Sequence, residues 1–527
     1  MEKINGRKLS LIFIFILILL VIALLVGKFT YSYLGPTISD DLETQGEVTA
    51  SGDTLIFTKG NNLSLSATTD NFTTGGTNLT STTNPKVKLV ASTKTNQASA
   101  TYYVGVYIKS NSYVYTTSGK TPELILTIKD EKGNNVTSGV DGLTYVTSGG
   151  VSGFDVTGKK GLFNIKTDYP ISTTSSSAGT THTWTFTLTF VNLGTDQSDN
   201  ENASMNVDIY LQKEKQNQLL TDYIISQYTG TQGGNGLYYH DASLTNGAGD
   251  NSYRYAGASE SVNNYVCFGS NTTPCPADNL YRIIGVFGEN NHGVTGKQLV
   301  KLIKYDYATS NLLGTDGDYK GSVTSDSGFY EGSLTSIDTY SWNYKATNKS
   351  SDTWSTSLLN KINLNTNYLN NIGTTWSNLI EDATWKVSGH STSAVTPSEM
   401  YTAEITNATK TYGPIDGTSK IGLVYASDYG FAASPSAWTT TLHKYGGNDV
   451  NGTSIKTINW MYIGHNDWTI SPYSSYSNNV FLLFYLGRVD NGGAFNGYGS
   501  RPVLYLKSSV LYDGGSGTKD SPITLVV

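Results

Sequence analysis

Charged residues and sulfur are both scarce in this sequence. Charged side chains make up 15% of the 527 residues, the net charge is -7, and there are only two cysteines and four methionines. Lys and Arg are not clustered, so the positive patch that nucleic-acid binding requires is missing. The polar residues are mainly Thr, Ser, Asn and Gly, which favours strands and turns over surface helices. We therefore expect no nucleic-acid partner.

Common catalytic motifs are also missing. None of the six histidines stands in an HExxH pattern, and no serine stands in GxSxG. We therefore expect no catalytic residue, no metal site and no cofactor, and a protein that is not an enzyme. The alternative is a glycan-active hydrolase of the cell envelope, with an acidic pair somewhere in Asp316–Asp338. Such a pair is recognised by its spacing in the folded protein and not by sequence.

The two cysteines, Cys267 and Cys275, are separated by seven residues. In an exported chain, two close cysteines most simply form one small disulfide loop. A metal site is the alternative, but it would need two further ligands, and no CxxC or HxxxH spacing accompanies this pair. A structural disulfide is the prediction.

One long apolar run, Leu9–Gly27, stands out near the start of the sequence, directly behind Lys3, Arg7 and Lys8. About 20 apolar residues are enough for a helix to cross a bilayer. Basic flanks stay in the cytoplasm. The pattern predicts a cytoplasmic flank at residues 1–8, a single-pass anchor at 9–29, and an extracellular remainder. A cleaved signal peptide is the alternative, although such signals have shorter apolar cores and a small-x-small cleavage site.

Residues 38–213 show the alternation of β-strands. In Thr183–Phe190 the residues Trp184, Phe186, Leu188 and Phe190 share one face and threonines occupy the other. Alternation also marks Ala203–Leu211, Glu123–Asp130 and Tyr102–Ile108. Six to eight strands without intervening helices predict an immunoglobulin-like β-sandwich. No catalytic group lies on these strands, so we expect a stalk.

Helical patterns begin after a charged break at Lys213–Gln216. Gln218–Tyr228 has apolar residues at helical spacing. Trp354–Leu369 reads as one helix or two short ones, and Thr396–Ile405 opens with Thr, Pro and Glu in a capping-box arrangement. Residues 216–527 are therefore expected to form a second domain of mixed α+β structure.

Five ordered segments in this second domain carry a resemblance. They are Asn263–Phe287, Leu299–Ile303, Lys420–Gly430, Ile458–Pro472 and Gly499–Val510. In this order they resemble an uncharacterised domain of anchored surface proteins from gut-dwelling Gram-positive bacteria, over roughly Tyr239–Val527. The closing arginine-proline and apolar strand are also similar to C-type-lectin-like domains, including formylglycine-generating-enzyme-like folds. The resemblance implies an irregular fold with a small sheet, a few helices and long loops. Formylglycine generation is not implied, because no cysteine follows Cys275.

In variable lectin-like proteins, the ligand contacts lie just before the last strand. The corresponding stretch here, Tyr473–Tyr498, is rich in Tyr, Ser, Asn and Gly, which provide large contact area and adaptable hydrogen bonds. The candidate ligand-binding residues are Tyr473, Tyr476, Asn478, Arg488, Asp490, Asn491, Phe495, Asn496 and Tyr498. The alternative is that they are ordinary solvated turn residues.

Together these patterns predict a mostly-β protein: an N-terminal transmembrane helix, an immunoglobulin-like β-sandwich and a C-type-lectin-like α+β head. We expect a membrane-anchored recognition or adhesion protein at the cell surface, with an unidentified protein or glycan as its ligand.

Overall fold

The computed structural model describes most of the chain after residue 43. The described ranges are 44–48, 53–67, 76–140, 142–288, 296–316, 330–334, 337–344, 352–408, 416–446 and 453–527. The predicted anchor at residues 9–29 lies outside them. No helix within these ranges is long and apolar enough to span a membrane. Strands make up 38% of the structure and helices 16%, so the predicted mostly-β character is confirmed.

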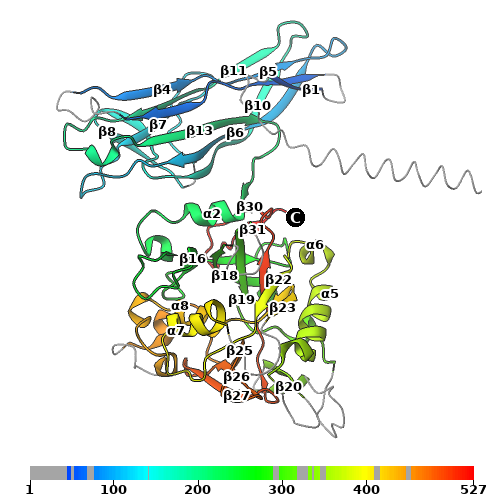
Figure 1. Cartoon of the computed structure of the whole chain (residues 1–527). Coiled ribbons are helices and arrows are strands. Elements are labelled where there is room, and N and C mark those ends of the chain that lie inside the picture. The colour runs from blue at the N-terminus through cyan, green and yellow to red at the C-terminus, as the bar shows by residue number, and fades with distance from the viewer. Residues whose placement is uncertain are drawn as a thin grey trace, which may run out of the picture.

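The described chain forms two units with separate hydrophobic cores (Figure 1). The N-terminal unit, residues 44–212, buries side chains from Leu55 to Ile209. The C-terminal unit, residues 218–527, buries a larger set from Leu220 to Leu525. Neither core shares a residue with the other.

Three antiparallel sheets build the N-terminal unit. Their strand orders are β1 (Thr44–Val48), β2 (Thr54–Thr58), β5 (Lys86–Val90) and β11 (Thr180–Thr183); β10 (Gly161–Thr173), β6 (Ala98–Asn111), β13 (Ser204–Gln212) and β3 (Leu63–Ser66); and β4 (Leu79–Thr83), β12 (Thr185–Phe190), β7 (Leu124–Lys129), β9 (Val151–Asp155) and β8 (Thr144–Ser148). Each of the four strands predicted from alternation is present. Trp184, Phe186, Leu188 and Phe190 are fully buried, which confirms the predicted apolar face.

An antiparallel sheet forms the centre of the C-terminal unit. Its strand order is β15 (Leu237–His240), β16 (Ser252–Tyr255), β18 (Leu280–Phe287), β19 (Leu299–Lys304), β29 (Val503–Leu506) and β24 (Ile421–Gly422), and β17 (Tyr265–Cys267) also pairs with β18. Every residue of β18 and β19 is buried, so helices and loops cover both faces of the sheet there.

Smaller sheets and short helices surround this centre. The sheets are β14 (Gln218–Leu219), β30 (Leu511–Gly514) and β31 (Thr524–Leu525); β20 (Tyr330–Leu334), β21 (Ile337–Ser341) and β28 (Gly497–Tyr498); β22 (Ala383–Lys386) and β23 (Asp416–Ser419); and β25 (Asp467–Pro472), β26 (Asn479–Leu483) and β27 (Val489–Gly493). The helices are α2 (Leu220–Ser226), α4 (Ser310–Leu313), a π-helical segment (Leu359–Tyr368) continued by α5 (Leu369–Asn371), α6 (Thr374–Ser377), α7 (Pro397–Tyr401), α8 (Ala426–Phe431) and α9 (Ile455–Ile458).

The predicted helices are present. Helix α2 lies within Gln218–Tyr228, and the π-helical segment and α5 lie within or next to Trp354–Leu369. At the start of α7 the Thr396 side chain accepts a hydrogen bond from the backbone amide of Glu399. The Glu399 carboxylate in turn accepts one from the backbone amide of Thr396 at 2.8 Å. The predicted capping box is therefore confirmed.

Helix α2 lies at the junction between the two units. It contacts β10 of the N-terminal unit and β18, β19 and β30 of its own unit. Across the junction, the Leu162 amide donates to the Gln218 side chain at 3.3 Å, and the Tyr107 hydroxyl lies 3.5 Å from the Asp222 carboxylate. The C-terminal hairpin of β30 and β31 returns to the same junction (Figure 1).

Candidate functional site

The stretch predicted to bind a ligand folds into the sheet of β25, β26 and β27. This sheet lies at the end of the C-terminal unit that is farthest from the N-terminal unit (Figure 1). Strands β26 and β27 form a hairpin in which Phe481 faces Asn491 and Leu482 faces Asp490. Residues directly opposite in an antiparallel pair point to the same face, so this register decides which candidates lie together.

One face of the hairpin carries aromatic and amide side chains. The Tyr473 ring meets Phe481 edge-on at 5.2 Å between centroids, and the Tyr476 ring stacks on Tyr473 at 5.7 Å. Asn491 accepts a 2.8 Å hydrogen bond from the Asn479 side chain. The Phe495 ring covers the same face, since a Cβ at the neighbouring Gly493 would lie 2.5 Å from it. We call Tyr473, Tyr476, Asn491 and Phe495 the aromatic face.

The opposite face carries a charged pair. Arg488 donates from Nε and Nη2 to the same Asp490 oxygen at 3.0 and 2.9 Å, and its guanidinium lies 4.2 Å from the centre of the Phe484 ring. Tyr498 is on this side, where it packs against Trp468 at 4.7 Å. Asn478 and Asn496 lie in the connections before β26 and after β27. The nine candidates thus lie on one hairpin and its flanking segments, but they are divided between its two faces and between its open end and its turn.

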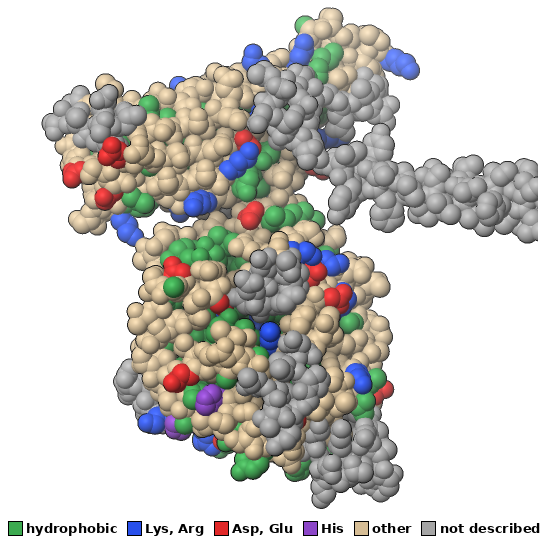
Figure 2. Space-filling view, viewed as in Figure 1, with side chains coloured by type: hydrophobic (Ala, Val, Ile, Leu, Met, Phe, Trp, Pro, Cys, Tyr) green, Lys and Arg blue, Asp and Glu red, His purple; other side chains and the backbone are tan. Residues whose placement is uncertain are grey.

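Exposed aromatic rings are concentrated on this sheet. Tyr476, Tyr485 and Phe495 are 58%, 47% and 38% exposed. Tyr476 and Phe495 lie at the open end of the hairpin, and Tyr485 lies in its turn, roughly 15 Å away along the strands. Figure 2 shows that Lys, Arg, Asp and Glu are scattered over the visible side, and neither sign gathers into a patch.

The core of the unit holds this sheet rigidly. The Trp468 indole donates to the Tyr340 carbonyl at 2.8 Å, and the Trp342 indole donates to the Thr469 carbonyl at 2.9 Å. Beneath them, Arg501 donates to the buried Asp467 carboxylate at 2.6 Å. Trp468, Trp460 and Trp376 are buried.

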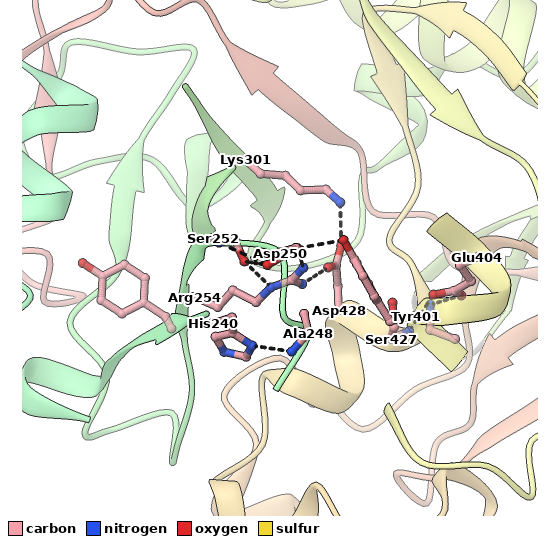
Figure 3. Close-up of polar contacts among 12 residues, drawn as sticks. His240, Ala248, Asp250, Ser252, Arg254, Lys301, Tyr401, Glu404, Ser427 and Asp428 are labelled. Carbon is pink, nitrogen blue, oxygen red and sulfur yellow. Dashed lines mark hydrogen bonds and ion pairs between the residues drawn. The ribbon is translucent and has the colours of Figure 1, made fainter. Parts of the chain in front are cut away.

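A second polar cluster, which the sequence did not reveal, is buried beside the central sheet (Figure 3). Arg254 of β16 donates to Asp428 of α8 at 2.7 Å and to Asp250 at 2.7 Å, and Lys301 of β19 lies 2.5 Å from the other Asp428 oxygen. The Tyr401 hydroxyl of α7 donates to Asp250 at 2.8 Å. We call Asp250, Arg254, Lys301 and Asp428 the ionic tetrad.

The ionic tetrad is a structural cross-link between the sheet and helices α7 and α8. It holds two positive and two negative groups, each at most 10% exposed, so the charges balance without solvent. Burial lowers the pKa of Lys301. Burial opposes ionisation of Asp250, but the Arg254 guanidinium and the hydrogen bond from Ser252 hold the Asp250 pKa well below its ordinary value. The signal in sequence is a basic residue between large apolar or aromatic neighbours: Arg254 between Tyr253 and Tyr255, and Lys301 between Val300 and Leu302.

Two titratable groups flank the tetrad (Figure 3). His240 is buried against Phe431 and Trp438, and its Nδ1 accepts from the Ala248 amide at 3.1 Å. Burial and the nearby Arg254 charge lower its pKa to about 3. Burial raises the pKa of Glu404 to about 7, although the Ala426 and Ser427 amides donate to its carboxylate. Neither group is positioned to meet a ligand from solvent.

The predicted disulfide is present between Cys267 and Cys275. The region proposed for a hydrolytic acid pair, Asp316–Asp338, lies mostly outside the described residues. Within the described part of it, the two Asp338 oxygens accept from the Ser310 amide and the Tyr330 hydroxyl.

Comparisons with protein-family models, curated proteins and solved structures found no match to this chain.

Proposed function

We propose that the chain is a cell-surface recognition protein whose aromatic face binds a protein or glycan ligand. The observation that carries the proposal is the pair of exposed rings, Tyr476 and Phe495, at the end of the molecule opposite the N-terminal unit. Exposed aromatic rings next to amides provide apolar contact area and hydrogen bonds in one place. Such rings are typical anchor residues of binding interfaces.

The remaining parts of the proposal concern how the aromatic face is held away from the membrane. Residues 9–29 would anchor the chain in the bacterial membrane, residues 38–213 would serve as an immunoglobulin-like stalk, and residues 216–527 would form a C-type-lectin-like head. The arrangement that supports this assignment is the order of the units: the aromatic face is remote from the point where the N-terminal unit joins. The likeness to surface-protein domains of Gram-positive bacteria belongs to the same proposal.

The test compares binding of the full chain and of single variants to a glycan array and to intact cells. Tyr476→Ala and Phe495→Ala are expected to weaken binding by about tenfold or more, as removal of an aromatic anchor does. Tyr485→Ala is the matched control, because it removes an equally exposed ring from the other end of the hairpin. Arg488→Ala reports on the opposite face and is expected to change binding less than twofold.

Three outcomes would overturn the proposal. They are unchanged binding of Tyr476→Ala and Phe495→Ala, an equal loss in Tyr485→Ala, and release of sugar from cell-wall polymer by the purified chain. The last result would favour the hydrolase instead.

A further inference from the structure

A groove separate from the aromatic face opens on the C-terminal unit. Its volume is about 700 Å³, within the range of small-ligand pockets. The disulfide loop and the C-terminal hairpin form one side, the end of β19 forms the floor, and β21 forms the other side. The lining residues that matter for binding are Asp278, Lys304, Asp306, Asp338, Lys519 and Asp520.

The floor contains a lysine whose charge is poorly compensated. The Lys304 side chain is 1% exposed, yet the carboxylate nearest to its ammonium, that of Asp278, lies 3.8 Å away and is itself half exposed. A buried ammonium needs a close anionic or hydrogen-bonding partner to offset its lost hydration. At 3.8 Å the contact is longer than a hydrogen bond, so the Lys304 ammonium keeps donors for a further polar partner.

Two further polar groups on the floor lack a partner. The Tyr307 hydroxyl and the Thr309 hydroxyl are buried and make no hydrogen bond within the described part of the chain. Both residues line the groove beside Lys304. Buried hydroxyls of this kind are ordinarily bonded, so two hydrogen-bonding groups in the residues that line the groove are left unsatisfied.

The walls have the opposite charge. They carry the carboxylates of Asp278, Asp306, Asp338 and Asp520, against the single ammonium of Lys519. Asp306 and Asp520 are exposed, and Lys519 lies 5.0 Å from the centre of the Tyr305 ring. A ligand in the groove would therefore meet a positive floor and a negative rim.

We propose that this groove binds a zwitterionic ligand of oligopeptide size, whose carboxylate pairs with Lys304 and whose ammonium group lies near Asp306 and Asp520. A charge-assisted hydrogen bond from Lys304 to the ligand would replace its distant contact with Asp278. Burial lowers the pKa of Lys304 in the free protein, and a bound carboxylate would raise it again. This site does not depend on the aromatic face.

The test is calorimetric titration of the full chain with alanyl-lysyl-alanine. Two further peptides serve as comparisons. Alanyl-lysyl-alanine amide lacks the C-terminal carboxylate, and acetyl-alanyl-glutamyl-alanine lacks the positive charges. Each of these two peptides is expected to bind at least tenfold more weakly than the free tripeptide. Lys304→Met should weaken binding of the free tripeptide tenfold or more and abolish the preference for the free acid over the amide.

A double variant keeps the proposal testable if Lys304→Met does not fold. Asp306→Asn with Asp520→Asn changes two exposed side chains, and it should weaken binding of the free tripeptide while leaving the melting temperature unchanged. Asp199→Asn, an exposed change on the N-terminal unit, is the matched control. Equal affinity for acid and amide, unchanged binding in a folded Lys304→Met, or no binding at about 1 mM peptide would each overturn the proposal.

Discussion

At the scale of single residues, two sets of buried charges in the C-terminal unit have close partners of opposite charge. The ionic tetrad and the Arg501–Asp467 pair both follow this pattern. Arg254 also lies 4.6 Å from the centre of the Phe287 ring, which adds a favourable interaction with the π-face. Removal of one member would leave a buried charge unpaired, which is far more costly than the pair itself is stabilising.

His240 gives the C-terminal unit a dependence on pH. The pKa of His240 is about 3 in the folded protein and about 6.5 in an unfolded chain. Between these two pH values the His240 imidazole is protonated in the unfolded state and neutral in the folded state. The contribution of His240 to the free energy of unfolding is therefore full above pH 6.5 and falls as the pH decreases toward 3. At pH 5 the expected loss is about 2 kcal/mol.

The measurement compares denaturant unfolding of the wild type and His240→Gln at pH 8 and pH 5. The stability difference between the two proteins should shrink by about 2 kcal/mol at the lower pH, because glutamine does not titrate. His443→Gln, a change at an exposed histidine, should show the same difference at both values. A constant difference for His240→Gln would contradict the prediction.

At the scale of elements, the predictions succeeded where a segment has one buried and one solvated face. β12 and β13 alternate strictly in sequence, although Thr189 and Asp208 on their polar sides are also buried, and the cap of α7 is encoded by Thr396 and Glu399. β18 and β19 are buried on both faces, so their sequences carry no alternation that distinguishes them from a buried helix. The sheet order around them depends on contacts between distant segments.

The sequence located the candidate site but did not predict how its residues are arranged, because that arrangement depends on strand pairing. The resemblance to lectin-like proteins located the stretch from Tyr473 to Tyr498, its composition supported that choice, and the structure folds it into one hairpin with its flanking loops. Asp490 and Asn491 are consecutive in β27 and so lie on opposite faces, and the register of β26 against β27 decides which face each of them takes. No local signal in the sequence sets that register.

The cap of α7 allows a test at this scale. Thr396→Ala removes the side chain that accepts from the Glu399 amide and is expected to destabilise the C-terminal unit by about 1 kcal/mol. Tryptophan fluorescence during urea unfolding is a suitable measurement, since every tryptophan except Trp184 lies in that unit. Thr396→Ser keeps the acceptor and should stay near the wild type. Equal losses in both variants would show that the cap is not the cause.

At the scale of the whole molecule, the two units are joined by a small set of contacts around α2. The Tyr223 ring of α2 stacks on Tyr512 of β30 at 3.8 Å between centroids, and Lys215 donates to the Asp513 carbonyl at 2.6 Å. These contacts tie the segment that leaves the N-terminal unit to the C-terminal hairpin. The connection is therefore ordered by residues that are almost 300 positions away in sequence.

Trypsin provides a probe of this junction, because Lys213 and Lys215 are cleavage sites within it. Tyr512→Ser removes the stacked ring and should increase the rate of cleavage there about 3- to 10-fold, as the open state becomes more populated. Tyr485→Ser removes an exposed ring far from the junction and should leave the rate unchanged. Equal rates in the wild type and Tyr512→Ser would contradict the role given to the stack.

The pairing of β14 with β30 also has a mechanical consequence. The covalent path between the two units runs through residues 213–217, and β14 is only two residues long. A force that pulls on the chain from the N-terminal unit would reach the pairing of Gln218 before that of Leu219. The two pairs would therefore break one after the other and not together. The two residue pairs of β14 would therefore separate before the load reaches Leu220 and Ile224 of α2, which belong to the C-terminal core.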